Sequence, residues 1–392
     1  MTLTSIQMLG EDHGDVAGLR ILGFCDYYGP ASAGGSERVA REVTTRLVGW
    51  GAHVTVATAV SGSAFADRDV DVHVRERAFD VSALAGAQLT VSPGYTRWAI
   101  DLVERLRPQV LYAQSLHFHS SVTAARVSRR VGIPLVTVVH VGGLEHLHGR
   151  TRVLAEAYER TVGTYVLRSS TAVIAVGSAV AAHARARGAG DRVTVAANGV
   201  DLERFQPRPD PAGPPVITFV GRLVANKGPE VLLDASELLR RADIDHRVVV
   251  VGAGPLRPRL AASAAGRRLP VHFVGHCDDV APWLAASHVV VRPSFTEGMP
   301  LAVLEAMASR RCVVASDIPA HRELLAAGGG LLHRPGDPDD LARALLLVIG
   351  DPDRRERHAA RALTTARAHS WFDTARAHAA VLAAAARRER TS

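Results

Sequence analysis

The sequence predicts an α/β protein of two doubly wound, Rossmann-like domains that face each other across a cleft. Apolar strand-like runs alternate with helical patterns from residue 19 to about residue 350, which is typical of parallel sheets. Five prolines lie within residues 206–215 and indicate a stiff linker without helix. The chain has 392 residues, of which 47% are hydrophobic, so it can form two cores of ordinary size.

Each expected strand is a short run of β-branched and other apolar residues. In the first half these runs are Leu19–Phe24, His53–Thr58, Val110–Ala113, Pro134–Val139, Thr171–Val176 and Arg192–Ala196. In the second half they are Val216–Val220, Arg247–Val251, Val271–Val274, Val289–Arg292, Cys312–Ala315 and Gly330–Leu332. We therefore expect an N-terminal domain at residues 1–205 and a C-terminal domain at residues 206–370. Residues 353–390 are rich in Ala and Arg and predict long helices, interrupted near residue 370.

Composition narrows the class of protein. Cys25, Cys277 and Cys312 lie far apart, without the spacing of a disulfide framework, which favours a reducing, cytoplasmic location. Residues 1–18 contain no apolar stretch of the kind a signal peptide needs, and no apolar run predicts stable membrane insertion. The net charge is +7, but arginines occur throughout and only 5% of residues are aromatic. We therefore expect an anionic substrate, such as a diphosphate, and no nucleic-acid partner.

One segment of the second half suits a diphosphate. Residues 221–228 follow a predicted strand and hold Arg222 together with Lys227, the only lysine of the chain. Arginine offers a planar fork and lysine a compact charge on a flexible stem, so the two can hold a diphosphate from two directions. The alternative is a solvated basic helix start. Cations are unfavourable at that end of a helix unless an anion binds there, which favours the phosphate interpretation.

A second segment, residues 294–307, suits a sugar nucleotide. Proline fits the first turn of a helix, and the turn that follows presents free N–H groups to an anion. Glu297 lies before this predicted helix and Glu305 within it. A carboxylate accepts two hydrogen bonds, so one can hold the hydroxyls of a donor sugar and the other those of a ribose. The donor contacts expected from this segment are Glu297, Gly298, Met299, Pro300, Leu301 and Glu305.

The two segments resemble the retaining family-4 glycosyltransferases (glycosyl transferases group 1) of the GT-B fold. The resemblance runs from about Leu19 to about Trp371 and includes Gly34-Gly35-Ser36-Glu37-Arg38 and Asn198-Gly199-Val200-Asp201. It implies transfer of a hexose or amino sugar from a nucleoside-diphosphate sugar, UDP-linked, with retention and without a cofactor. It also implies that the helix within residues 371–392 crosses back to the N-terminal domain.

The resemblance assigns further residues. It implies a catalytic set of His140, Glu297, Arg222 and Lys227, and donor contacts from Gly34, Gly35, Gly252, Val274 and His276. A purely structural role stays open at three of these positions: a tight turn at Gly34, a core histidine at His140 and a surface histidine at His276. Neither glycine-rich segment contains Gly-x-Gly-x-x-Gly, so a nicotinamide site is not expected. Ser36 is the expected N-cap of a helix that opens at Glu37.

Polar residues of the first half suggest the acceptor site, for which we expect Asp26, His117, Glu145 and His146. Histidines near these residues also raise the possibility of a metal, but no pair has helical ligand spacing and we expect none. The Ala- and Arg-rich composition resembles that of actinobacteria, which favours a small soluble acceptor such as an aminocyclitol of antibiotic biosynthesis.

Other functions remain open at this point. Similar enzymes act on lipids, inositol phosphates or polysaccharides. A phosphorylase of the same fold would bind pyridoxal phosphate through Lys227, the only lysine. A glycoside hydrolase would use Glu297 and Glu305 as its two carboxylates, but has no need of the Arg222 and Lys227 segment. A catalytically silent nucleotide-binding protein would have no need of Glu297.

Overall fold

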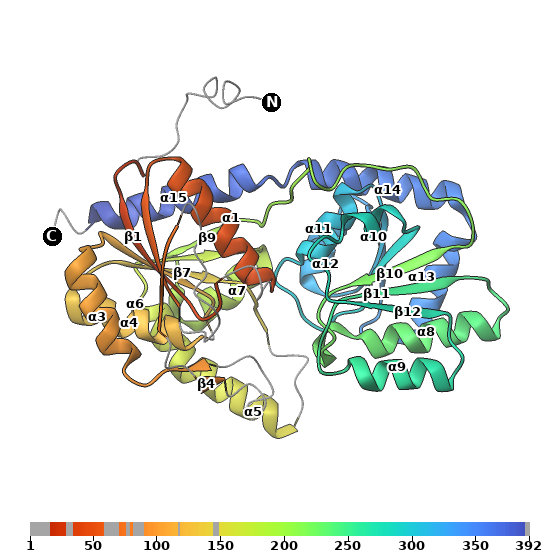
Figure 1. The fold of residues 1–392 in the computed structure, drawn as a ribbon, viewed down its shortest axis with the longest axis horizontal. Helices are drawn as coiled ribbons and strands as arrows, with labels where there is room; N and C mark the ends of the chain where they lie inside the picture. Colours follow the sequence, from red (N-terminus) through yellow and green to blue (C-terminus); the bar gives the residue numbers. More distant parts are fainter. Residues whose placement is uncertain are drawn as a thin grey trace, which may run out of the picture. The chain divides into compact units, whose positions relative to one another are not determined.

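The computed structural model describes residues 16–28, 34–58, 70–75, 79–80, 90–116, 118–143 and 149–388. The chain divides into two compact α/β units (Figure 1). The first contains the described residues up to Gly142, then Arg150–Ala197 and the last helix from Trp371; the second contains Asn198–Ser370. No helix of the described ranges is long and apolar enough to cross a membrane.

The first unit is built on a seven-stranded parallel sheet. Its strands, in spatial order, are β3 (Asp71–Val74), β2 (His53–Thr58), β1 (Arg20–Cys25), β6 (Val110–Gln114), β7 (Leu135–Val139), β8 (Ala172–Ala175) and β9 (Val193–Val195). Every strand except β3 coincides with an expected strand to within about two residues. β3 was not expected because it is short, alternates in polarity and lies at the sheet edge, where none of its four residues is buried. A separate antiparallel pair joins β4 (Phe79–Asp80) to β5 (Thr90–Val91).

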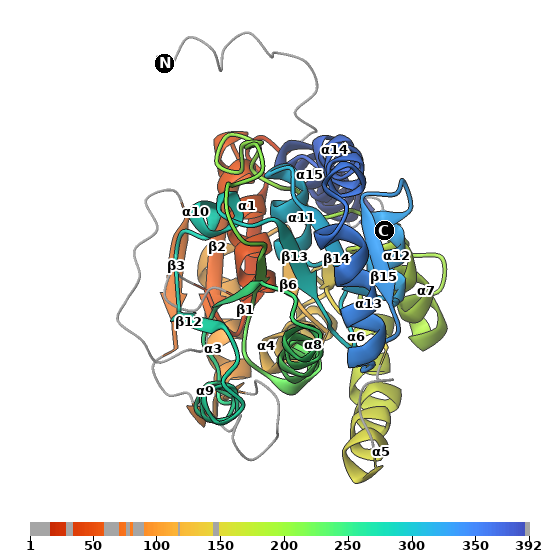
Figure 2. The ribbon, with the colours of Figure 1, turned by 90° about the vertical axis from the view of Figure 1, so that its right-hand side faces the viewer.

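Helices cover both faces of this sheet (Figures 1 and 2). Figure 1 shows α1 and α15 on one face and α3, α4 and α6 on the other. Their bounds are α1 (Gly35–Gly49), α3 (Tyr95–Leu106), α4 (His119–Val131), α5 (Gly149–Tyr158), α6 (Thr164–Ser169), α7 (Ser178–Ala184) and α15 (Trp371–Arg388). A π-helical turn, η3 (Glu159–Gly163), continues α5. The segment η4 (Arg185–Ala189) follows α7, and Gly188 within it has the non-helical φ of 111°.

The second unit is built on a six-stranded parallel sheet. Its spatial order is β12 (Val271–Gly275), β11 (Arg247–Val251), β10 (Val216–Val220), β13 (Val289–Arg292), β14 (Cys312–Ser316) and β15 (Gly330–His333). The covering helices are α8 (Pro229–Arg241), α9 (Arg257–Gly266), α10 (Ala281–Ala285), α11 (Leu301–Ala308), α12 (Pro319–Leu325), α13 (Pro338–Ile349) and α14 (Pro352–Arg367). Apolar side chains of the strands, α8 and α13 form its core. The expected α/β architecture of two doubly wound sheets is therefore confirmed.

The units divide at Ala197 and Asn198, eight positions before the expected boundary at residue 206. The Asn198 side-chain amide donates to the carbonyl of Met299 at 3.0 Å, which ties this segment to the second unit. The proline-rich segment belongs there too, because Asp210 accepts from the buried guanidinium of Arg311 at 3.2 Å and from Arg355 at 2.7 Å. Proline marks a helix-free segment but does not show which core that segment packs on.

The last helix belongs to the first unit. α14 ends at Arg367 and α15 begins at Trp371, so the C-terminal helices are interrupted near residue 370, as expected from the sequence. α15 packs on α1, where the Trp50 and Phe372 rings meet edge to face at 5.5 Å. The Thr374 hydroxyl donates to the carbonyl of Ala197 at 2.8 Å.

Candidate active site

Each sheet has one point at which the strand order reverses. In the second unit this point lies between β10 and β13, because β10 is followed along the chain by β11 on one side and has β13 on its other side. Ligands of open α/β sheets bind beyond the carboxyl ends of the strands at such a point. The loops that leave β10 and β13 there are residues 221–228 and 293–300, which are the two segments that the sequence singled out.

Glycines allow these two loops to touch. Gly228 has φ 65°, and a Cβ on it would lie 2.1 Å from the carbonyl oxygen of Pro293. Gly221 faces the Arg292 guanidinium in the same way, at 2.3 Å. The N–H of Phe295 donates to the carbonyl of Asn226 at 2.9 Å. The loops are therefore held against each other, because only glycine fits at these positions.

A buried ion cluster lies where the loops meet. The Lys227 ammonium donates to Glu297 Oε2 at 2.6 Å, and the Arg292 guanidinium contacts Glu297 Oε1 at 2.7 Å. The Ser294 hydroxyl donates to the same Oε1 at 2.8 Å. Arg292 also donates to the carbonyl of Val220 at 2.6 Å, which fixes it to the end of β10. Glu297 is thus the common acceptor of the two loops.

The charges of this cluster do not balance. Burial would raise the pKa of Glu297, but Arg292 and Lys227 hold it well below its usual range, so the carboxylate is charged. Burial lowers the pKa of Lys227 to about 8, and Glu297 opposes the change. Lys227 is therefore still charged at neutral pH. Two cations, Lys227 and Arg292, thus contact the single carboxylate of Glu297, and the charge of Arg222 also acts on Lys227, which favours an anionic ligand.

The start of α11 adds donors to the same place. α11 begins at Leu301 and has no side-chain cap, so its first N–H groups, including those of Leu301 and Ala302, are not used by a cap. Pro300 is the N-cap residue with extended backbone, one position before the first helical turn in which we expected it. Glu305 is 5% exposed, so it is not a solvated charge on the helix surface.

In the first unit, His140 follows the end of β7. Its Nε2 lies 3.0 Å from the amide oxygen of Gln114 at the end of β6. Since an amide oxygen only accepts, Nε2 carries the proton and Nδ1 is left as an acceptor. Burial lowers the pKa of His140 to about 4, so the imidazole is neutral at physiological pH. A neutral, oriented imidazole can contact a sugar hydroxyl without adding charge.

Comparison with known proteins identifies the family. The model described as Glycosyl transferases group 1 matches residues 214–351, and that described as Glycosyltransferase Family 4 matches residues 33–204. The GDP-mannose-dependent alpha-(1-6)-phosphatidylinositol dimannoside mannosyltransferase of Mycobacterium tuberculosis is 32% identical over 294 residues, covering 70% of this chain and 74% of the relative. The chain is a family-4 glycosyltransferase.

Other relatives of this glycosyltransferase differ in the reactions that their names give. The D-inositol 3-phosphate glycosyltransferase of Pseudarthrobacter chlorophenolicus is 29% identical and covers 88% of the chain and 89% of the relative. The alpha-D-kanosaminyltransferase of Streptomyces kanamyceticus is 26% identical and covers 68% of the chain and 75% of the relative. Among solved structures, Anabaena HepE in complex with UDP-glucose superposes with a TM-score of 0.74 at 20% identity, covering 92% of this chain and 98% of that one. This likeness shows the GT-B fold.

The other expected donor residues of the glycosyltransferase lie at strand ends. Gly252 follows β11 with φ 141°, and a Cβ on it would lie 1.9 Å from the carbonyl oxygen of Gly221, so it supports the loop of Arg222 and Lys227. Val274 is half-buried within β12. His276 follows β12, is exposed and pairs with Asp278 at 3.2 Å, which agrees with the alternative of a surface loop histidine for its side chain.

The glycine-rich loop after β1 opens α1 earlier than expected. The described part begins at Gly34, which is the N-cap residue, and Gly35 is the first helical residue. Ser36 is therefore not the N-cap; its hydroxyl donates to Glu37 at 3.1 Å. A Cβ on Gly34 would lie 2.3 Å from the carboxylate of Glu37, because that acid folds back over the helix start. The preceding residues 29–33 lie outside the described ranges.

The expected acceptor residues are only partly described. Asp26 is fully buried, and its carboxylate accepts from the N–H groups of Ser120 at 2.9 Å and His119 at 3.3 Å. It thereby closes the start of α4 and presents no surface to an acceptor. His117, Glu145 and His146 lie outside the described residues. Among the residues that are described, no three His, Cys, Asp or Glu side chains form a group that could hold a metal ion.

Two residues of the cluster, Arg292 and His321, were not predicted from the sequence. Arg292 was predicted only as the last residue of a strand. A cation at the end of a buried apolar run indicates a site residue as well as His140 after β7 does. His321 of α12 is fully buried and donates from Nδ1 to the carbonyl of Ser316 at 2.8 Å. Burial lowers its pKa to about 4, against the attraction of Glu297. Its position in the sequence gives no sign of this neighbourhood.

Proposed function

We propose that this glycosyltransferase moves a hexose or amino sugar from a nucleoside-diphosphate sugar, UDP-linked, to a hydroxyl of a small soluble acceptor in the cytoplasm, with retention at the anomeric carbon. The observation that carries the donor assignment is the excess of cations around Glu297 next to the uncapped start of α11. A departing diphosphate supplies the negative charge that this arrangement lacks.

Each residue has a role in this proposal. The bond between the anomeric carbon and the diphosphate oxygen breaks, and the charge that grows on that oxygen is stabilised by Arg222, Lys227 and the amides of the α11 turn. The acceptor oxygen then bonds to the anomeric carbon on the same face, and its proton passes to the departing diphosphate. Glu297 and the neutral His140 hold the sugar, and Glu305 holds the ribose.

The pairing of Lys227 with Glu297 also bears on the phosphorylase alternative. A lysine that forms a Schiff base must act as a free amine, whereas Lys227 is charged and held by a carboxylate at 2.6 Å. This geometry supports a lysine that binds phosphate. An absorbance scan of the purified protein tests it, since bound pyridoxal phosphate would give a visible band.

For the acceptor we propose an aminocyclitol of antibiotic biosynthesis, supported by the similarity to a kanosaminyltransferase. His117, Glu145 and His146 remain the proposed acceptor residues, and Asp26 leaves this set because it is buried against α4. A phosphorylated inositol is the second candidate, because the D-inositol 3-phosphate glycosyltransferase relative spans most of both chains.

A matrix of donors and acceptors tests the proposal. Purified protein is incubated with UDP- and GDP-linked hexoses and amino sugars, each with an aminocyclitol, an inositol phosphate and a phosphatidylinositol, and products are detected by mass spectrometry. We expect product with a UDP-sugar and the aminocyclitol, and an anomeric proton coupling that shows retention. Transfer from GDP-mannose alone would contradict the donor assignment, and product only with an inositol would contradict the acceptor assignment.

A further inference from the structure

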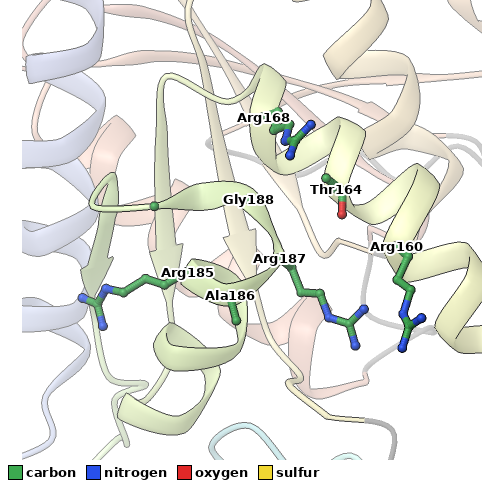
Figure 3. Close-up of a pocket in the computed structure, with 8 residues that line it drawn as sticks. Arg160, Thr164, Arg168, Arg185, Ala186, Arg187 and Gly188 are labelled. Atoms are coloured by element: carbon green, nitrogen blue, oxygen red, sulfur yellow. The ribbon is translucent and has the colours of Figure 1, made fainter.

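A second basic site belongs to the first unit, whereas the donor cluster around Glu297 belongs to the second. It is a pocket of about 580 Å³ between the helix formed by η3 and α6 on one side and η4 on the other (Figure 3). It is lined by Arg160, Thr164, Arg168, Arg185, Ala186, Arg187, Gly188 and Gly190. A volume of this size is in the range of small-molecule sites.

The arginines of this pocket outnumber the acids around them. Arg187 lies 3.6 Å from Glu159, but that buried carboxylate is shared with His183 at 3.1 Å. Arg160 lies 3.5 Å from Glu156, which already pairs with Arg152 at 3.0 Å. None of the lining residues is acidic. Guanidinium groups gathered without matching carboxylates repel each other, and a bound anion would relieve this repulsion.

Arg168 adds a further positive charge to the arginines of this pocket. Its guanidinium has no carboxylate partner among the residues that the structure describes, and it lies beside Gly188, which has φ 111°. In Figure 3, Arg160 and Arg187 extend in the same direction from facing elements, whereas Arg185 points the other way. Arg185 instead donates to the carbonyl of Val193 at 3.3 Å. Arg160 and Arg187 are therefore the first candidates for holding a ligand, and Arg168, which Figure 3 shows at the other end of the same helix as Arg160, is the third.

The backbone around the pocket is unusual. One wall contains the π-helical turn η3, and such turns are rare and occur often at functional sites. The other wall contains η4, in which Gly188 leaves the helical conformation with φ 111°. A Cβ on Gly188 would lie 3.2 Å from Arg168 Cγ and 3.3 Å from Thr164 Cγ2. Glycine thus keeps this wall clear of a side chain that would press on both residues.

We propose that this pocket binds a phosphorylated polyol or sugar, of about the size of a hexose phosphate. The guanidinium fork matches the oxygens of a phosphate and binds them bidentately. The Thr164 hydroxyl already donates to the carbonyl of Glu159 at 3.1 Å, so its oxygen can accept from a ligand hydroxyl. A ligand with both a phosphate and hydroxyls satisfies the two requirements together. This inference does not depend on the identity of the donor or the acceptor.

Calorimetry on the full chain tests the proposal. A Lys227→Ala background weakens phosphate binding at the donor cluster, so that glucose 6-phosphate, glucose and inorganic phosphate report on the first unit. We expect one glucose 6-phosphate site, weaker binding of inorganic phosphate and no binding of glucose. Arg187→Gln and Arg168→Gln should each raise the Kd at least about tenfold, the scale of one charge-assisted hydrogen bond.

Two further variants serve as controls, one for folding and one for the specificity of the pocket. Arg160→Gln changes a side chain that is 70% exposed, so it tests the same pocket with little risk to folding. Arg126→Gln removes an exposed arginine of α4 in the same unit and should leave the Kd unchanged. Equal loss in Arg126→Gln, an unchanged Kd in the three pocket variants, or equal affinity for inorganic phosphate and glucose 6-phosphate would overturn the proposal.

Discussion

The Tyr112 hydroxyl lies 2.5 Å from Nδ1 of His378, and this hydrogen bond joins the middle of the first sheet to the last helix across 266 positions of the chain. Both residues are fully buried. Tyr112 shares a face of β6 with Gln114, which contacts His140. A row of polar side chains therefore runs from α15 to the residue that we place against the donor sugar.

This row makes the first unit sensitive to acid. Burial lowers the pKa of His378 to about 3, so the folded state stays unprotonated while the unfolded chain binds a proton below about pH 6.5. The free energy of unfolding should therefore fall as pH drops from about 6.5, and His378 alone should account for about 2 kcal/mol between pH 7 and pH 5. His378→Gln should remove that part of the loss.

Urea titrations followed by tryptophan fluorescence measure this effect, because Trp50, Trp98 and Trp371 all lie in the first unit. His53→Gln changes an exposed histidine of β2 and serves as the control. Equal acid sensitivity of the parent and His378→Gln would show that His378 is already protonated in the folded state.

Elements were predictable from sequence because their signals are local. Apolar runs such as those of β7 and β13 determine strands, and the same runs place His140 and residues 293–300 at strand ends. The partners of charged residues were not predictable. Lys227 and Glu297 were assigned to phosphate and sugar separately, and their 2.6 Å contact depends on how closely two glycine-containing loops approach. The contact of Tyr112 with His378 depends on helix packing, for which neither residue carries a local sign.

Lys227→Ala tests the diphosphate assignment. The remaining Glu297 still has Arg292 at 2.7 Å and Ser294 at 2.8 Å, so the variant should fold. UDP binding should weaken by roughly 1.5–3 kcal/mol, the scale of one charge-assisted hydrogen bond, and transfer should be abolished. Calorimetry measures the affinity, with Arg240→Ala at the far end of α8 as control. Unchanged UDP affinity in folded Lys227→Ala would refute the assignment.

The pH dependence of donor binding should follow Lys227. Its pKa is lowered to about 8, so the ammonium is present below that pH and is lost above it. UDP affinity should therefore decline between about pH 7.5 and pH 9. Lys227→Arg keeps a cation throughout this range, so its UDP affinity should be flat whatever its absolute value. A parallel decline in Lys227→Arg would assign the titration to another group.

Substitutions of Glu297 and Glu305 should affect different steps, the first the turnover of the sugar nucleotide and the second the binding of UDP. Glu297→Gln keeps the shape of the side chain but removes its charge, so Lys227 and Arg292 lose their buried counter-ion, which should cost about 3–5 kcal/mol of stability. Circular dichroism therefore checks that the variant is folded before binding is measured. We expect this variant to retain UDP binding and to lose turnover of the intact sugar nucleotide. Glu305→Gln should weaken UDP binding itself, because its proposed partner is the ribose. The same pattern in both variants would contradict the division.

The last prediction concerns whether the histidines of residues 144–148 bind the acceptor or a metal ion. Lys227, Arg222, Arg292 and the α11 turn already bring to a departing diphosphate the positive charge that a divalent ion would supply. A further cation at that place would be repelled by them. Activity should therefore survive exhaustive dialysis against EDTA, and His146→Ala should raise the Michaelis constant of the acceptor more than that of the donor. Activity that is lost in EDTA and restored by Mg²⁺, Mn²⁺ or Zn²⁺ would instead make the histidines metal ligands.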